Sequence, residues 1–197
     1  MQGDIPEVAE IGGIRADIYG EIDQSMPAVI LCPPHPLYGG SRRDIRLVRI
    51  AETLSSAGIT AIPLDYSRYD RGCGEIEDVI TVIDSLSEKV RWVGLLGYSF
   101  GAVVGSNAAA RTNISLRGFV ALSILERIDD IKADLSFDTP KLFIHGKYDS
   151  IAPLSAFRKL CEDAKGEKYW LILETDHFYA GMLSRVAQAV LEFFKKR

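Results

Sequence analysis

Apolar residues recur along the chain in short unbroken runs that alternate with longer stretches of helical character. The short runs are typical of buried strands and cover residues 28–32, 59–64, 92–96, 118–124, 141–145 and 168–173. The longer stretches predict helices over residues 44–57, 75–90, 102–110, 153–164 and 183–194. Strands that alternate with helices in this way predict a mostly parallel sheet with helices on both faces.

The first segment has a different pattern. Residues 8–19 alternate between apolar and polar positions around Gly12 and Gly13, which predicts a β-hairpin. The expected fold is therefore an α/β, three-layer αβα sandwich whose mostly parallel sheet gains an antiparallel edge from an N-terminal hairpin. No linker, repeat or low-complexity run divides the sequence, so we expect residues 1–197 to form one domain.

Composition narrows the class of protein. The 197 residues are 47% hydrophobic and 25% charged, as in soluble globular proteins. A net charge of −4 argues against nucleic acid as the main partner. No apolar run approaches the roughly 18 residues of a membrane span, so no membrane partner is expected.

The cysteines and the first residues bear on location. The three cysteines are scattered without a CxxC pair, which argues against a zinc site or a disulfide framework. The first residues, 1–4, lack the basic and apolar pattern of a secretory leader, so a cytoplasmic location is expected. Asn and Gln together number only five, which fits a thermostable protein and fits chance composition equally well.

A candidate nucleophile follows the strand predicted over residues 92–96. Ligands bind beyond the carboxyl ends of strands in such sheets, and here the chain reads Gly97-Tyr98-Ser99-Phe100-Gly101 before a predicted helix. This G-x-S-x-G pattern places a serine on a sharp strand-to-helix turn, where glycines permit close backbone approach. The alternative is a glycine-rich turn whose serine only caps the helix.

A base and an acid follow two later strands. In this architecture the chain order is serine, acid, histidine, and only His177 lies after Ser99 with room for an acid between them. Asp149 follows the strand over residues 141–145 and is expected to accept the Nδ1 proton of His177. Asp176 is a rival acid, expected in a supporting role, and His145 is expected to be structural.

The segment over residues 33–40 is a candidate oxyanion loop. Acyl transfer needs backbone N–H donors where the carbonyl oxygen becomes negative, and the amide of Phe100 is one expected donor. The second is expected from the amide of Leu37, with Tyr38 next, because the prolines in the loop have no N–H. His35 is expected to brace the loop. The alternative is a proline-rich turn with no catalytic role.

These motifs together resemble the α/β-hydrolase superfamily. The likeness is greatest to small, lidless members near dienelactone hydrolases and short-chain carboxylesterases, and it covers nearly the whole chain in element order. The resemblance implies that Ser99, Asp149 and His177 are catalytic and that residues 35–40 match an HP-x-x-GG oxyanion loop. A dienelactone hydrolase proper would have cysteine where this chain has Ser99, which favours an ester or a thioester as substrate.

The resemblance also bears on the pocket. The family commonly inserts a helical lid, whereas here about fifteen mostly polar residues, 125–139, connect two strands, with room for at most one short helix. An open pocket is therefore implied, suited to small or short acyl groups. Aromatic side chains expected as pocket walls are Tyr38, Tyr98, Phe100, Phe178 and Tyr179.

A cluster of arginines follows the oxyanion loop. Arg42, Arg43 and Arg46 lie near the start of a predicted helix, where cations oppose the helix dipole. Arg42 and Arg43 are therefore candidate contacts for an anionic substrate, such as the phosphates of an acyl-coenzyme A. The alternative is that the arginines pair with neighbouring aspartates, among them Asp44 and Asp65.

The sequence thus predicts a serine hydrolase that cleaves small carboxylic esters through an acyl-enzyme, with no cofactor and no metal. One alternative is an acyl-coenzyme A thioester hydrolase with the same triad. Another is a non-catalytic binding protein on a hydrolase fold, because fold alone establishes no chemistry.

Overall fold

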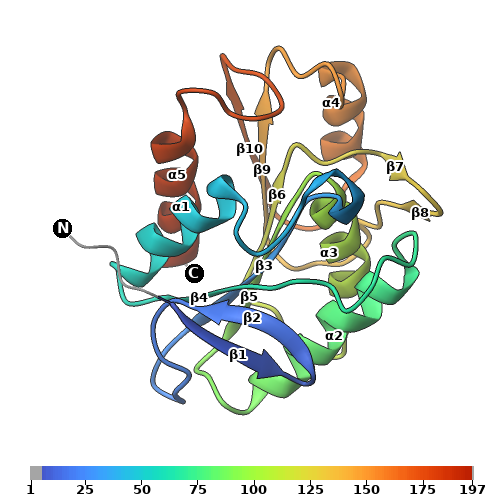
Figure 1. Cartoon of the computed structure of the whole chain (residues 1–197). Coiled ribbons are helices and arrows are strands. Elements are labelled where there is room, and N and C mark those ends of the chain that lie inside the picture. Colours follow the sequence, from blue (N-terminus) through green and yellow to red (C-terminus); the bar gives the residue numbers. More distant parts are fainter. Residues whose placement is uncertain (1–5, 197) are drawn as a thin grey trace.

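Six parallel strands form the central sheet of the computed structural model, which describes residues 6–196 (Figure 1). The strands are β3 (Ala28–Cys32), β4 (Thr60–Pro63), β5 (Val93–Tyr98), β6 (Phe119–Leu122), β9 (Lys141–Gly146) and β10 (Lys168–Leu173). Their order across the sheet is β10-β9-β6-β5-β3-β4. The parallel register places the carboxyl ends of all six strands along one edge. The expectation about a leader concerns residues 1–4, which lie outside the described residues.

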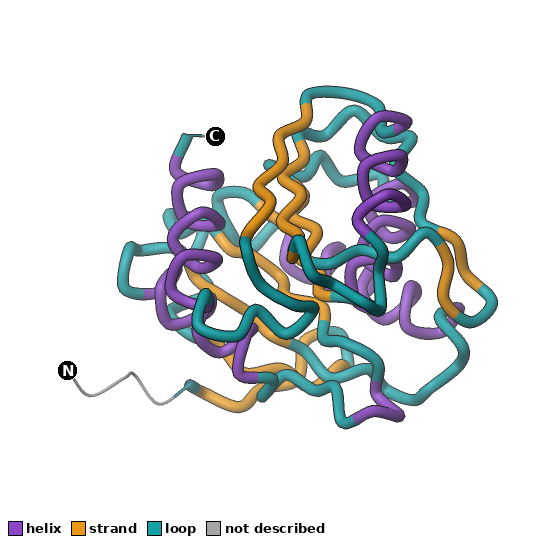
Figure 2. Tube along the Cα trace, turned by 90° about the horizontal axis from the view of Figure 1, so that it is seen from above, coloured by secondary structure: helices purple, strands orange, loops and turns teal. Residues whose placement is uncertain are grey.

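Helices cover both faces of this sheet, which confirms the predicted three-layer sandwich (Figures 1 and 2). Helices α1 (Ile45–Ser55) and α5 (Leu183–Lys195) lie on one face, and α2 (Cys73–Ser87), α3 (Phe100–Arg111) and α4 (Leu154–Asp163) lie on the other. Strand side chains alternate between the two cores: Leu31 packs with α1 and α5, and Ile30 packs with α2 and α3. Within residues 6–196, no helix is both long and apolar enough to cross a membrane.

The N-terminal hairpin consists of β1 (Glu7–Ile11) and β2 (Ile14–Ile18), which pair antiparallel as predicted. The sequence suggested that the hairpin adds an antiparallel edge to the main sheet. In the structure it is instead a separate two-stranded sheet. Only two isolated bridges, Ala16 with Leu64 and Tyr19 with Ala61, join it to the β4 segment. Pro63 lies between the bridged residues of that segment and has no N–H, so a continuous ladder cannot form there.

A buried arginine fastens this hairpin to the sheet. The Arg42 side chain is 7% exposed, and its Nε donates to Oδ1 of Asp17 in β2 over 2.7 Å. Its Nη1 donates to Asp65, which follows β4, and the Arg42 amide donates to the same carboxylate over 2.8 Å. Arg42 therefore connects β2, the segment after the candidate oxyanion loop and the segment after β4.

The connection over residues 125–139 contains no helix. Two strands of two residues each, β7 (Arg127–Ile128) and β8 (Ile131–Lys132), form a small antiparallel hairpin. Asp129, in its turn, has a left-handed φ of 49°. The sequence pattern did not indicate this hairpin because two-residue strands carry no detectable alternation.

We predict that replacing Arg42 by Met destabilises the protein by about 3 kcal/mol, because the Asp17 carboxylate is left buried without its partner. Chemical denaturation of the wild type and the variant measures this difference. Arg43→Met is the matched control, since Arg43 is exposed, and it should change the free energy of unfolding by no more than about 0.5 kcal/mol. Equal effects of the two substitutions would contradict the anchoring role of Arg42.

Candidate active site

Ser99 lies on a strained turn between β5 and α3. Its φ of 55° and ψ of −116° are unfavourable for a residue with a side chain, as expected for a serine presented on a strand-to-helix turn. A Cβ at position 97 would overlap the carbonyl of Gly101, and a Cβ at position 101 would overlap the carbonyls of Cys32 and Pro33. Both glycines are therefore required for the helix to approach the strands so closely.

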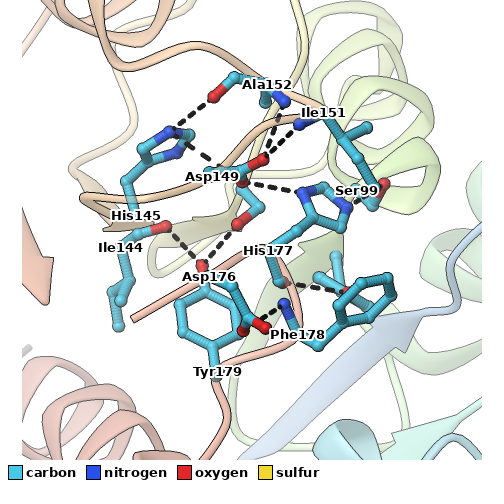
Figure 3. A network of polar contacts seen from close by, with 12 residues as sticks. Ser99, Ile144, His145, Asp149, Ile151, Ala152, Asp176, His177, Phe178 and Tyr179 are labelled. Carbon is cyan, nitrogen blue, oxygen red and sulfur yellow. Dashed lines mark hydrogen bonds and ion pairs between the residues drawn. The ribbon is translucent and has the colours of Figure 1, made fainter. Parts of the chain in front are cut away.

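The structure brings Ser99, His177 and Asp149 together, although they follow three different strands (Figure 3). Ser99 Oγ lies 3.0 Å from Nε2 of His177, and Nδ1 of His177 lies 2.7 Å from Oδ2 of Asp149. All three residues are buried. A carboxylate only accepts, so Nδ1 of His177 carries the proton, and the lone pair on Nε2 faces the serine hydroxyl.

The loop after β9 supports Asp149. Burial opposes ionisation of this carboxyl, but the hydrogen bonds from His177 and from the Ile151 and Ala152 amides outweigh it and lower its pKa. Those two amides donate to Oδ1 over 2.9 and 2.8 Å, while Oδ2 is left to His177. The carboxylate is therefore charged at neutral pH and is oriented by its own loop.

The loop after β10 holds His177 by its backbone. The Asp176 carboxylate accepts from the Phe178 amide over 3.0 Å and from the Ala180 amide over 3.3 Å. Tyr98 Oη donates to the His177 carbonyl over 3.1 Å. Asp176 thus stabilises the turn that carries His177, in keeping with the supporting role expected for it.

His145 lies behind Asp149, away from Ser99 (Figure 3). Its ring is fully buried and stacks on Phe157 at 4.1 Å between centroids, and Nε2 donates to the Ala152 carbonyl over 2.9 Å. Its Nδ1 is buried without a hydrogen-bond partner among the described residues. Burial lowers the pKa of His145, and the Asp149 carboxylate offsets this only in part.

The candidate oxyanion loop forms a short 3₁₀ helix, η1 (Pro36–Tyr38), after β3. The Leu37 amide, the first expected donor, already donates to Nδ1 of His35 over 3.2 Å. The Tyr38 amide, the second choice, donates to the His35 carbonyl over 3.0 Å, and Gly39 and Gly40 also have acceptors within the loop.

The amides without an acceptor differ from those expected in this loop. Within residues 33–40, the backbone N–H of His35 is the one amide with no hydrogen-bond acceptor among the described residues. The Phe100 amide, at the first residue of α3, has none either. The sequence could not indicate His35 as a donor, because which amides remain free depends on how the loop closes on itself.

An open cleft of about 360 Å³ lies over Ser99 and His177. The expected wall residues Tyr38, Tyr98 and Phe178 all line it. Apolar side chains that no sequence motif indicated also line it, namely Leu125, Ile128 and Ile151. Of the other two expected wall residues, Phe100 and Tyr179 are fully buried beneath the site.

Of the arginine cluster, only Arg46 lines the cleft. Arg42 is buried between Asp17 and Asp65, and the exposed Arg43 lies outside the cleft lining. Arg46 does line the cleft, 4.6 Å above the centre of the Tyr98 ring, but it pairs with Asp44. The expectation that Arg42 receives an anionic substrate is therefore wrong, because its side chain is buried between two carboxylates and does not line the cleft.

No group of three or more His, Cys, Asp or Glu side chains in the described part of the chain has the geometry to hold a metal ion. The cleft holds instead the hydroxyl of Ser99 within hydrogen-bond distance of His177, an arrangement in which a base can activate a nucleophile.

We predict that neutral His145 contributes stability that is lost in acid. A histidine whose pKa is lowered by folding stabilises the fold fully above its unfolded pKa of 6.5, and less as the pH falls toward the folded value. The melting temperature of the wild type should therefore fall more between pH 7 and pH 5 than that of His145→Gln, whose amide keeps a donor for Ala152 and does not titrate. Parallel declines in the two proteins would contradict this prediction.

Comparison with known proteins agrees with this fold. A lidless α/β serine hydrolase from Xanthomonas campestris has 21% identity and a TM-score of 0.80, with 97% of this chain and 94% of that chain covered. A dienelactone hydrolase from Anabaena variabilis has 20% identity and a TM-score of 0.77, with 98% and 99% covered. An uncharacterised protein from Rickettsia prowazekii is 23% identical over 188 residues, which cover 85% of this chain and 78% of that protein.

The family comparison is more specific. The family described as Serine hydrolase (FSH1) matches residues 65–180, more than half of the chain, and this range includes Ser99, Asp149 and His177. The predicted resemblance to lidless α/β hydrolases is thereby confirmed, and the protein belongs to the Serine hydrolase (FSH1) family.

Proposed function

We propose that this protein hydrolyses carboxylic esters of small or short-chain acyl groups, with Ser99 as nucleophile, His177 as base and Asp149 as the orienting acid. The observation that carries this proposal is the unbroken hydrogen-bonded series from Ser99 Oγ through His177 to Asp149, at the floor of an open cleft. A strained turn that presents a serine to a base is typical of a nucleophile.

The chemistry follows from the positions of the protons. Ser99 Oγ attacks the ester carbonyl as its proton passes to Nε2 of His177, and the charged Asp149 stabilises the resulting imidazolium. Collapse of the tetrahedral intermediate breaks the bond to the alkoxy oxygen, which leaves as an alcohol with the proton from Nε2. Water then attacks the acyl-enzyme carbonyl as its proton passes to Nε2 of His177. Collapse of this second tetrahedral intermediate breaks the acyl bond to Ser99 Oγ, which takes the proton back from Nε2, and the carboxylic acid leaves.

Two backbone amides are suited to hold the oxyanion. The Phe100 amide lies at the N-terminus of α3, where the helix dipole also favours negative charge. For the second donor we propose the His35 amide in place of that of Leu37, because the Leu37 N–H already has an acceptor. The His35 and Phe100 rings lie 4.8 Å apart, which brings the two residues to the same side of the site.

The size and the lining of the cleft favour small esters over coenzyme A thioesters as substrates. Its volume of about 360 Å³ lies near the lower end of ligand pockets, and Leu125, Ile128 and Ile151 give it an apolar lining. The thioester alternative depended on free arginines, and Arg42 and Arg46 are both paired with carboxylates. The non-catalytic alternative does not account for the strained Ser99 and its ordered base.

Replacing Ser99 by Ala is predicted to lower hydrolysis of p-nitrophenyl acetate by about 10⁴-fold or more, because no other hydroxyl among residues 6–196 lies at Nε2 of His177. A fluorophosphonate probe should label the wild type and not the variant. Ser41→Ala, which removes a hydroxyl outside this site, should retain both activities. Unchanged turnover in Ser99→Ala would overturn the proposed function.

The oxyanion assignment is tested by comparing His35→Pro with His35→Ala. Both lack the imidazole, but only proline also lacks the N–H, and the φ of −59° at His35 suits proline. The kcat of His35→Pro should be about 10²-fold below that of His35→Ala, the usual effect of losing one oxyanion donor. Equal kcat values would assign the second donor elsewhere.

A further inference from the structure

The His35 side chain is held at both ring nitrogens. Nε2 lies 3.0 Å from Oδ2 of Asp129, and Nδ1 lies 3.2 Å from the Leu37 amide nitrogen. The carboxylate only accepts and the amide only donates, so the proton is on Nε2 and Nδ1 has none. The two partners therefore select one neutral tautomer of a ring that is 8% exposed.

Aromatic neighbours restrict the same ring. Its centroid lies 4.8 Å from that of Tyr38, 4.8 Å from that of Phe100 and 5.2 Å from that of Tyr69. The ring is therefore packed among aromatic side chains and cannot turn freely. Because His35 also accepts the Tyr38 and Gly40 amides at its carbonyl, side chain and backbone of this residue form one rigid unit.

Asp129 reaches His35 from a segment 94 residues away, the turn of the β7–β8 hairpin. The turn itself is anchored outside the cleft. Asp130 accepts from Arg71 Nε over 2.5 Å and from Nη2 over 2.9 Å, and the Asp130 amide donates to the Arg71 carbonyl. Ile131 packs so closely on Gly72 that a Cβ at position 72 would overlap the Ile131 side chain. The hairpin therefore presents Asp129 to the loop from a defined position.

We propose that Asp129 is a positioning residue for the oxyanion site, acting through His35. The inference rests on the proposed function. By accepting the Nε2 proton, Asp129 keeps Nδ1 free to accept the Leu37 amide, which closes the turn and directs the His35 N–H toward the cleft. Without Asp129, the Nδ1–H tautomer becomes accessible, and its N–H would face the Leu37 N–H, donor against donor. The turn would then open and the oxyanion donor would move.

Removal of Asp129 is therefore expected to weaken stabilisation of the transition state without weakening substrate binding. A displaced oxyanion donor weakens binding of the tetrahedral intermediate but not of the neutral ester, so kcat falls while KM changes little. This split distinguishes positioning from a general structural role, which would lower the melting temperature or the amount of active protein instead.

Three variants of the β7–β8 segment test the inference, with kcat and KM measured on p-nitrophenyl acetate and the melting temperature measured on each protein. Asp129→Gly removes the carboxylate without straining the left-handed φ, and kcat should fall about 10-fold with KM within about twofold. Asp129→Asn keeps an oxygen acceptor for Nε2–H, and kcat should stay within about threefold of the wild type. Glu126→Ala is the matched control, because it removes an exposed carboxylate from the segment that leads into the same hairpin, and it should behave as the wild type.

A measurement on the unmodified protein adds a spectroscopic check. Long-range ¹H–¹⁵N correlation of the imidazole rings should show His35 as the Nε2–H tautomer in the wild type. The Nδ1–H tautomer there, wild-type kcat in Asp129→Gly, or an equal loss in Glu126→Ala would overturn the inference. If Ser99→Ala abolishes turnover while Asp129→Gly has no effect, only the positioning role fails. Turnover that survives in Ser99→Ala would instead remove the proposed function on which it rests.

Discussion

The site depends on a close approach of backbone at the carboxyl edge of the sheet. The first turn of α3 packs directly on the end of β5 and on the segment after β3, and neither contact has room for a Cβ at Gly97 or Gly101. That contact turns the chain sharply at Ser99 and places the Phe100 amide at the start of a helix. It also brings the loop over residues 33–40 next to the turn at Ser99. The parallel register then supplies Asp149 and His177 from β9 and β10 at the same edge.

The charged side chains that are buried around this edge of the sheet are paired with one another or hydrogen-bonded within the protein. Arg42 lies between two carboxylates, Arg46 pairs with Asp44, and Asp149 receives hydrogen bonds from His177 and two amides. Each of these groups would be costly to bury alone. Arg42 and Arg46, two of the arginines that suggested an anion site in the sequence, are therefore paired within the protein, and Leu125, Ile128 and Ile151 give the cleft an apolar lining. The positions of charged residues in the sequence did not show which of these side chains are left unpaired in the fold.

Particular elements show how far sequence reasoning reached. The strand at residues 28–32 was located to the residue, because a buried parallel strand is a continuous apolar run. The partly exposed edge strand at residues 168–173 was located to the residue as well, because aromatic and aliphatic residues follow one another there. Ser99, His177 and Asp149, which the structure joins by hydrogen bonds, were predicted from their order along the chain and from their positions directly after strands. The hairpin at β7–β8 and the free amide of His35 were not, since each depends on contacts between segments distant along the chain.

The sequence by itself determined the αβα layering and the order of the chemical groups, because apolar periodicity and the G-x-S-x-G turn are local properties of the chain. Only the tertiary structure decided which amides of the loop over residues 33–40 remain free, which arginines are neutralised, and that Asp129 meets His35. Those outcomes depend on competition among many donors and acceptors for few partners, and that competition is settled only when the segments are packed together.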